Sequence, residues 1–225
     1  MPEPSERRTP SGQAVDLAAL REEYRADRLE EREVAADPLD QLARWIAEAV
    51  AAGLPDPTAM TLATAGADGE PSARTVLCKG LEDGGVDFYT NLESRKAREL
   101  GANPRAAAVF CWTPLQRQVI VRGTVAPIPA EEADAYFASR PRDSQLGAWA
   151  SPQSRPVAGR DELDAALAAA TERFAEAPVP RPAWWGGFRL TPREVEVWQG
   201  RAARLHDRLR YRRDDGGWRL ERLAP

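Results

Sequence analysis

From residue 58 onward, the chain consists of short segments of strand-like composition that alternate with turn residues. Segments 58–65, 72–80 and 85–90 are separated by residues rich in glycine and aspartate, such as those at 66–69. Short segments joined by such turns are typical of antiparallel hairpins. We therefore expect an antiparallel sheet to organise this chain.

Strands and helices alternate unevenly through the rest of the chain. Further strands are expected at 105–112, 117–127, 185–191, 194–199, 207–213 and 217–223, and helices at 16–33, 94–101, 130–139, 143–150 and 160–177. This order is unlike a Rossmann-type repeat, and the sequence contains neither a GxGxxG nor a P-loop pattern. It favours a mainly β, α+β fold in which helices decorate an antiparallel β-barrel.

The stretch before the first strand carries a helix-start signal. Asp37 suits the N-cap and Pro38 the first helical position. Gly53 is placed to end this helix. An apolar stripe at helical spacing follows the cap, at Leu39, Leu42, Ile46 and Val50.

Composition excludes several classes of protein. No apolar run in the 225 residues approaches the roughly 20 residues that span a bilayer, and no signal-peptide core opens the chain. Two cysteines and a net charge of −4 argue against a disulfide scaffold and general nucleic-acid binding. We expect a cytoplasmic protein that binds no membrane, nucleic acid or metal. A disordered tail is expected at 1–15, and one domain at 16–225.

The segment Arg204–Arg208 (RLHDR) is the strongest local signal for chemistry. If it is extended, Arg204, His206 and Arg208 share one face, because alternate residues of a strand point the same way. Three such groups suit a phosphate or carboxylate. The alternative is an exposed basic edge strand, which would discourage aggregation.

Three other segments also suit anions. Residues 74–79 carry Arg74 and Lys79 on a predicted strand. Residues 89–96 combine hydroxyls with Arg95 and Lys96 at a predicted helix start. In residues 136–144, Tyr136 and Arg140 are four residues apart and so share one face of a helix. Each could instead be a solvated strand end or a capped helix. Together they indicate a β-barrel that binds phosphorylated small molecules, and the absence of a carboxylate pair or nucleophile elbow argues against a hydrolase.

An ordered set of motifs resembles the pyridoxamine 5'-phosphate oxidase family from about residue 16 to the C-terminus. The motifs are RTVLCK at 74–79, FYTNLESRK at 88–96, QRQV at 116–119, YFASRPRDSQLGAW at 136–149, WGGFR at 185–189, VEVWQGRAARLHDR at 195–208 and ERLAP at 221–225. The resemblance implies an FMN-binding split β-barrel that works as a homodimer with FMN at the subunit interface. It also implies oxidation of pyridoxine 5'-phosphate or pyridoxamine 5'-phosphate to pyridoxal 5'-phosphate, with O2 as electron acceptor and hydrogen peroxide as product, in vitamin B6 biosynthesis.

The resemblance also assigns residues to two phosphorylated ligands. The residues implied for FMN are Arg74, Thr75, Val76, Leu77, Cys78, Lys79, Tyr89, Thr90, Arg95, Lys96, Gln118, Gln153, Ser154, Trp198 and Arg208. Those implied for the substrate are Arg21, Tyr24, Lys79, Tyr136, Arg140, Ser144, Arg204 and His206, the last two as the catalytic pair. Residues 16–33 would form a mobile lid. Other split-barrel flavoproteins, including deazaflavin-dependent reductases, and a non-enzymatic flavin or pyridoxal 5'-phosphate carrier remain the alternatives.

Overall fold

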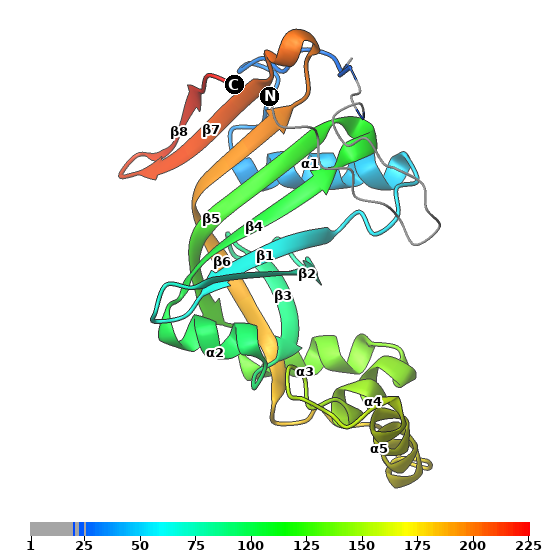
Figure 1. Cartoon of the computed structure of the whole chain (residues 1–225). Coiled ribbons are helices and arrows are strands. Elements are labelled where there is room, and N and C mark those ends of the chain that lie inside the picture. Colours follow the sequence, from blue (N-terminus) through cyan, green and yellow to red (C-terminus); the bar gives the residue numbers. More distant parts are fainter. Residues whose placement is uncertain (1–19, 21–22, 25) are drawn as a thin grey trace, which may run out of the picture.

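The computed structural model describes residue 20, residues 23–24 and residues 26–225 (Figure 1). Within these residues, eight strands form one antiparallel sheet in the order β2-β1-β4-β5-β6-β7-β8, and β3 pairs with β6 outside this order. The strands are β1 Ala59–Ala65, β2 Pro71–Leu77, β3 Val86–Asn91, β4 Arg105–Trp112, β5 Arg117–Pro127, β6 Trp185–Gln199, β7 Asp207–Asp214 and β8 Gly217–Arg222. The helices are α1 Pro38–Ala51, α2 Arg95–Ala102, α3 Ala130–Ser139, α4 Arg142–Ala150 and α5 Arg160–Arg173. The predicted α+β fold is confirmed as a split β-barrel decorated by helices.

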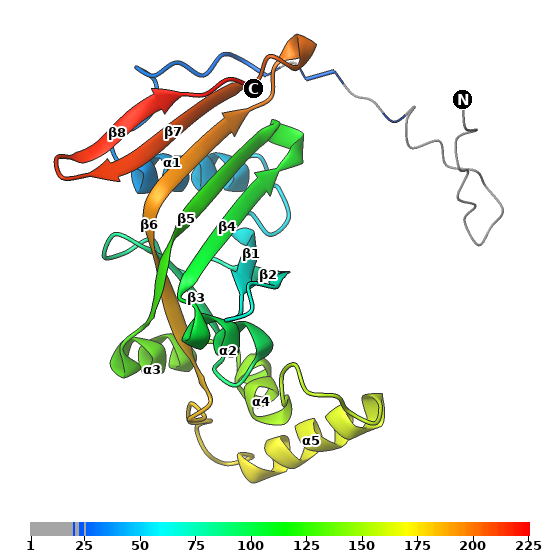
Figure 2. The same cartoon turned by 60° about the vertical axis from the view of Figure 1, so that its left-hand side comes forward.

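Strand β6 joins the two halves of the sheet. Its first half, residues 185–190, pairs with β3, and its second half, residues 194–199, pairs with β7. Its partner β5 runs alongside residues 188–199. Figure 2 shows the consequence, because β7 and β8 lie at one end of the molecule and helices α3, α4 and α5 lie at the other.

The sequence predicted two strands where the structure has β6 alone. The expected break lay between residues 191 and 194, next to Pro192, but the strand continues through it. The register with β5 shifts between Arg122 and Gly123, which leaves Arg193 without a partner in that ladder. A bulge of this kind absorbs the extra residue and bends the strand, so a proline is tolerated there.

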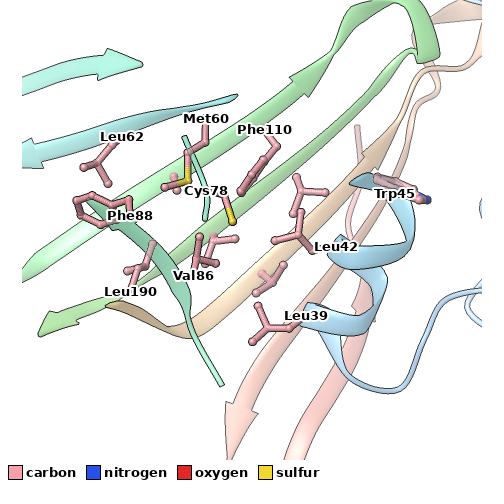
Figure 3. Close-up of a cluster of buried hydrophobic side chains, with 14 of the residues drawn as sticks. Leu39, Leu42, Trp45, Met60, Leu62, Cys78, Val86, Phe88, Phe110 and Leu190 are labelled. Carbon is pink, nitrogen blue, oxygen red and sulfur yellow. The ribbon is translucent and has the colours of Figure 1, made fainter. Parts of the chain in front are cut away.

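The core lies where α1 packs against the sheet (Figure 3). Leu42 and Trp45 of α1 are buried together with Met60, Leu62 and Phe110 from the strands. The helix begins as predicted, because the Asp37 carboxylate accepts a hydrogen bond from the Leu39 backbone N–H at 2.7 Å. The predicted apolar stripe is wrong at its end, because Val50 is 57% exposed. Ala49 is buried instead.

A second buried cluster lies among α3, α4, α5 and the start of β6. Phe137, Leu146, Phe174 and Trp185 contribute its largest side chains. The helix expected at 160–177 ends at Arg173. The chain then turns through Phe174 before it enters β6. These helices therefore form one wall beside the sheet, next to the site described below.

The helix predicted over residues 16–33 is wrong for the residues that the structure describes. Residues 26–30 have no regular secondary structure, and backbone groups of Ala26 and Leu29 bond to distant partners instead. Ala26 N–H donates to Gln116 and Leu29 N–H to Asp207, while Arg222 donates to the Leu29 carbonyl. Tertiary hydrogen bonds therefore satisfy groups that a helix would have satisfied internally. The tail predicted over 1–15 lies outside the described residues.

Across the part of the chain that the structure describes, no helix is both long enough and apolar enough to cross a membrane.

A glycine pair tests the bulge between β5 and β6. A Cβ atom at Gly123 would overlap the backbone oxygen of Thr191, whereas one at Gly101 of α2 would meet open space. We predict that Gly123→Ala lowers the free energy of unfolding by about 1–3 kcal/mol, because the backbone must shift. Gly101→Ala should leave it unchanged or raise it by up to about 1 kcal/mol. Urea unfolding of both variants measures this, and equal effects would contradict the close packing at the bulge.

Candidate ligand-binding site

A cavity of about 750 Å³ opens between β2, β3, the start of β6 and helices α2, α3 and α4. Its walls bring together three of the segments that the sequence selected separately as suited to anions. The lining residues are Arg74, Thr75, Val76, Leu77, Lys79, Tyr89, Thr90, Asn91, Lys96, Tyr136, Arg140, Pro141, Ser144, Gly147, Ala148, Ser151, Gln153 and Trp185. The cavity is therefore rich in cations and hydroxyls.

Lys96 lies in the cavity wall with only neutral partners. Its ammonium donates to Thr90 at 2.9 Å, to Gln153 at 2.8 Å and to Ser94 at 3.3 Å. Among the described residues no carboxylate forms an ion pair with it, although the residue is only 8% exposed. Burial, and secondly the Arg74 cation, lower the pKa of Lys96 to about 8. A buried cation without a counter-ion suits an anionic ligand.

Arg74 reaches the same wall from the neighbouring strand. Its guanidinium donates to the Leu62 carbonyl at 3.1 Å and to the hydroxyls of Thr64 and Ser72. Glu99 of α2 lies behind it, with an oxygen 3.3 Å from Arg74 Nη2. These contacts hold the guanidinium at the edge of the cavity.

A second cation of the cavity wall, Arg140, lies against aromatic rings. Arg140, at the end of α3, lies over Trp185, with its Cζ atom 4.8 Å from the ring centroid. The rings of Tyr89 and Tyr136 stack with their centroids 4.0 Å apart. Among the described residues, the Arg140 Nη1 atom is buried and has no hydrogen-bond partner. Ser144 also lines the cavity here. An unpaired buried donor beside a hydroxyl suits a phosphate oxygen.

Six of the other predicted residues form a second group at the far end of β6 from the cavity. Tyr24 makes edge contacts with Trp198 at 5.7 Å and with His206 at 5.3 Å. Arg204 lies over the Tyr24 ring at 5.5 Å. Gln118, Trp198 and Arg208 face one another across β5, β6 and β7 in register. None of these residues lines the cavity.

Strand β6 shows how far apart the two groups are. Trp185 begins the strand in the cavity and Trp198 lies near its end, in the second group. At about 3.3 Å per residue, this span is about 40 Å along the strand. In Figure 1, the turn after β6 lies at the top of the molecule and α4 lies near the bottom. One chain alone therefore does not assemble all the predicted residues into one site.

The structure differs from the predicted arrangement of Arg204, His206 and Arg208. Arg204 lies in a 3-10 turn with a φ of 62°, and the strand begins only at Asp207. Arg208 pairs with the buried Glu196 at 2.8 Å. The three groups are therefore not alternate residues of one strand, because the turn redirects the chain before β7.

Other predicted cofactor residues lie near the cavity without lining it. Cys78 is buried behind Lys79, and burial raises the pKa of its thiol to about 11. The Arg95 side chain is half exposed and pairs with Glu99 at 2.7 Å. Ser154 follows Gln153 in an exposed turn. Arg21 lies outside the described residues.

Sequence reasoning missed two residues that shape the site. Trp185 was part of a recognised motif but was assigned no role, and it supplies the ring beneath Arg140. Glu99 appears in the sequence only as a helix partner of Arg95, four residues away. Its contacts to Thr64 and Ser72 come from strands far away in the chain, so no local pattern could reveal them.

The hydrogen bonds of His206 define its tautomer. Its Nδ1 accepts the backbone N–H of Arg201 at 3.1 Å. The neutral ring therefore carries its proton on Nε2. Burial, and secondly the Arg204 cation, lower the pKa of His206. The lowered pKa favours the uncharged ring, which can donate a hydrogen bond from Nε2.

The antiparallel split barrel and its cation-lined cavity define a class of proteins, and comparisons with known proteins give the family. Residues 46–174 match the model of the pyridoxamine 5'-phosphate oxidase family. Residues 185–225 match that of the pyridoxine 5'-phosphate oxidase C-terminal dimerisation region. The chain belongs to the pyridoxamine 5'-phosphate oxidase family, as the motifs predicted.

Relatives match nearly the whole chain. Pyridoxine/pyridoxamine 5'-phosphate oxidase of Rubrobacter xylanophilus is 55% identical, and the match covers 96% of this chain and 100% of the Rubrobacter protein. The protein of the same name from a Nocardioides species is also 55% identical, and the match covers 94% of this chain and 99% of the Nocardioides protein.

Two solved structures share the fold. PhzG from Burkholderia lata, in complex with tetrahydrophenazine-1-carboxylic acid, has a TM-score of 0.83 at 34% identity and covers 89% of this chain and 99% of its own. A pyridoxamine 5'-phosphate oxidase-related, FMN-binding protein from Nostoc punctiforme has a TM-score of 0.65 at 19% identity, over 88% and 100%.

His206 is the only histidine of the chain, so its titration can be followed by one NMR signal. We predict a pKa below 6.5, because burial and Arg204 both disfavour the imidazolium. Arg204→Ala should raise the pKa but leave it below 6.5, because burial remains. Arg219→Ala, on exposed β8, is the control and should change nothing. A wild-type pKa at or above 6.5 would contradict the described environment.

Proposed function

We propose that this chain is an FMN-dependent oxidase that converts pyridoxine 5'-phosphate or pyridoxamine 5'-phosphate to pyridoxal 5'-phosphate. The observation that carries the proposal is the cavity, whose wall carries two separate groups of cations. Among the described residues, neither Lys96 nor Arg140 is paired with a carboxylate. Two phosphorylated ligands need two such groups. The relatives' shared name supports the same substrates.

One group of cavity residues fits the phosphate of FMN. Lys96 and Arg74 present cations there, and Thr90 and Gln153 add polar contacts. The buried Lys96 ammonium needs a counter-ion that the described residues do not supply. Tyr136, Arg140, Ser144 and Lys79 remain for the substrate phosphate.

We infer that each complete site forms between two copies of the chain. Gln118, Trp198 and Arg208 are implied cofactor residues, yet they lie at the far end of β6 from the cavity. The match of residues 185–225 to a dimerisation region includes Trp198 and Arg208. A homodimer in which the second group of one subunit faces the cavity of the other would complete both sites.

When bound, FMN would supply the acceptor for the hydride from the 4' carbon of the substrate, with O2 as the final electron acceptor and hydrogen peroxide as product; the amine substrate would also take up water and release ammonia. The protein positions the substrate. Arg204 supplies a cation next to the substrate ring. His206 donates a hydrogen bond from Nε2, and its Nδ1 is already occupied by the Arg201 N–H, so it orients the substrate instead of acting as a general base.

We infer that residues 16–33 act as a lid that excludes water from the substrate. Tyr24 supports this role, because its ring packs on Trp198 and His206. The two free thiols, Cys78 and Cys111, are consistent with the cytoplasmic location that we propose.

Flavin absorbance tests the proposed activity. In the absence of oxygen, pyridoxine 5'-phosphate should bleach the visible band of the FMN-loaded protein, because hydride transfer reduces the flavin. Admission of oxygen should restore the band, with pyridoxal 5'-phosphate formed. Binding without bleaching by either the alcohol or the amine would instead favour a carrier or a different split-barrel reductase.

Heterodimers test the shared site. We predict that Lys79→Ala and Arg204→Ala homodimers are each nearly inactive, since every site lacks one group. A heterodimer with one copy of each, purified through two different tags, should recover about half of the wild-type activity, because one of its two sites is intact. If all site residues came from one chain, both sites of the heterodimer would be defective and no activity would return.

A further inference from the structure

Glu99 is a nearly buried carboxylate to which the proposed oxidase function assigns no role of its own. It lies in α2, one turn after Arg95 and Lys96, and its side chain is 10% exposed. It does not line the cavity, so it does not touch a ligand held there. A buried charge is costly unless it is fully paired, so its partners indicate what it does.

Four groups from three elements donate to this carboxylate. One oxygen accepts the hydroxyls of Thr64 and Ser72, both at 2.6 Å, and lies 3.3 Å from Arg74 Nη2. The other accepts Arg95 Nε at 2.7 Å. Burial opposes the charge, but the hydrogen bonds from Ser72, Thr64 and Arg95 outweigh it and lower the pKa of Glu99 to about 2. The group is therefore ionised at every ordinary pH.

The contacts of Glu99 are also contacts of Arg74. The Thr64 and Ser72 hydroxyls each bond to both residues, so the carboxylate, the two hydroxyls and the guanidinium form one closed network. Arg74 can leave the cavity edge only by breaking several charge-assisted hydrogen bonds. The network thus determines where the Arg74 cation is presented.

The net charge around Glu99 also indicates that this residue prepares the cation group for a phosphate. Arg74, Arg95 and Lys96 lie around Glu99, and the Arg74 cation lowers the pKa of Lys96 while the Glu99 anion raises it. Three cations and one carboxylate leave a net charge of about +2, which complements a phosphate dianion. Without Glu99, the three cations would repel one another before any ligand arrived.

We propose that Glu99 is a positioning residue for the cofactor phosphate, which fixes Arg74 and Arg95 and balances the charge of the cation group. This inference rests on the proposed function, since it assumes that the FMN phosphate binds next to Lys96 and Arg74. It predicts a contribution to phosphate recognition alone, because Arg74 is the only cavity-lining partner of Glu99 among the described residues.

The test compares two flavins on the full-length Glu99→Gln protein. The amide keeps the size of the side chain but removes its charge. By flavin fluorescence, the dissociation constant for FMN should rise about ten- to hundredfold, the size expected for lost charge-assisted hydrogen bonds. Riboflavin, which has no phosphate, should bind with unchanged affinity. The loss of FMN affinity at alkaline pH should also begin at a lower pH than in the wild type, because Lys96 loses its nearby anion.

Glu194→Gln is the matched control. Glu194 is also a partly buried glutamate paired with arginines, at 2.8 Å from Arg122 and 3.8 Å from Arg210, but it does not line the cavity. Its loss should leave binding of both flavins unchanged. If Glu99→Gln weakens FMN and riboflavin equally, or weakens neither, the positioning role is wrong.

A second variant covers the case in which Glu99→Gln does not fold. Ser72→Ala removes the hydroxyl that links Glu99 to Arg74 from strand β2 while it leaves the charge. It should weaken FMN but not riboflavin, and an equal effect on both would overturn the proposal. A wild-type protein that binds neither flavin would instead refute the proposed function itself, and the role of Glu99 with it.

Discussion

The continuity of β6 is the constraint on which the rest of the structure depends. Because its first half pairs with β3 and its second half with β7, one strand connects the helix-walled cavity to the C-terminal hairpin. The bulge opposite Gly123 lets this strand bend past Pro192 without ending. The same strand carries Trp185 at the cavity and Trp198 in the second group. The continuous strand therefore keeps the cavity and the second group apart. For this reason the proposed site needs two subunits.

Two cations of the cavity, Lys96 and Arg140, are arranged differently from two paired arginines elsewhere in the fold. Arg189 is paired with Asp87, Asp83 and Glu132, and Arg222 with Glu31 and Asp207. Among the described residues, Lys96 and Arg140 instead have no carboxylate partner, although both are largely removed from water. Such positions lower the stability of the empty protein and favour binding of anions. Burial without a carboxylate partner therefore marks the site more clearly than the number of basic residues does.

Particular residues show how far the sequence could predict the fold and the site. Asp37 and Pro38 start α1 because capping is local, and the turn at 66–69 correctly joins β1 and β2 in a hairpin. The hairpin predicted between 72–80 and 85–90 is wrong as a pairing of β2 with β3, because β3 pairs with β6 instead of β2. The helix predicted over 16–33 fails where backbone groups of Ala26 and Leu29 find partners far away in the chain. Periodicity alone cannot separate a helix from an extended segment that is bonded to the rest of the fold.

By itself, the sequence determined the turn and cap chemistry, the alternation of strands and helices, the family motifs and the segments suited to phosphate, because these depend on neighbouring residues. Only the tertiary structure decided that three of those segments share one cavity while Gln118, Trp198, Arg204 and His206 lie elsewhere. It also decided which cations are neutralised, with Arg208 paired to Glu196 and Arg74 fixed by Glu99. The physical reason is that hydrogen bonds and ion pairs between residues distant in the chain depend on how strands and helices pack, which no local pattern encodes.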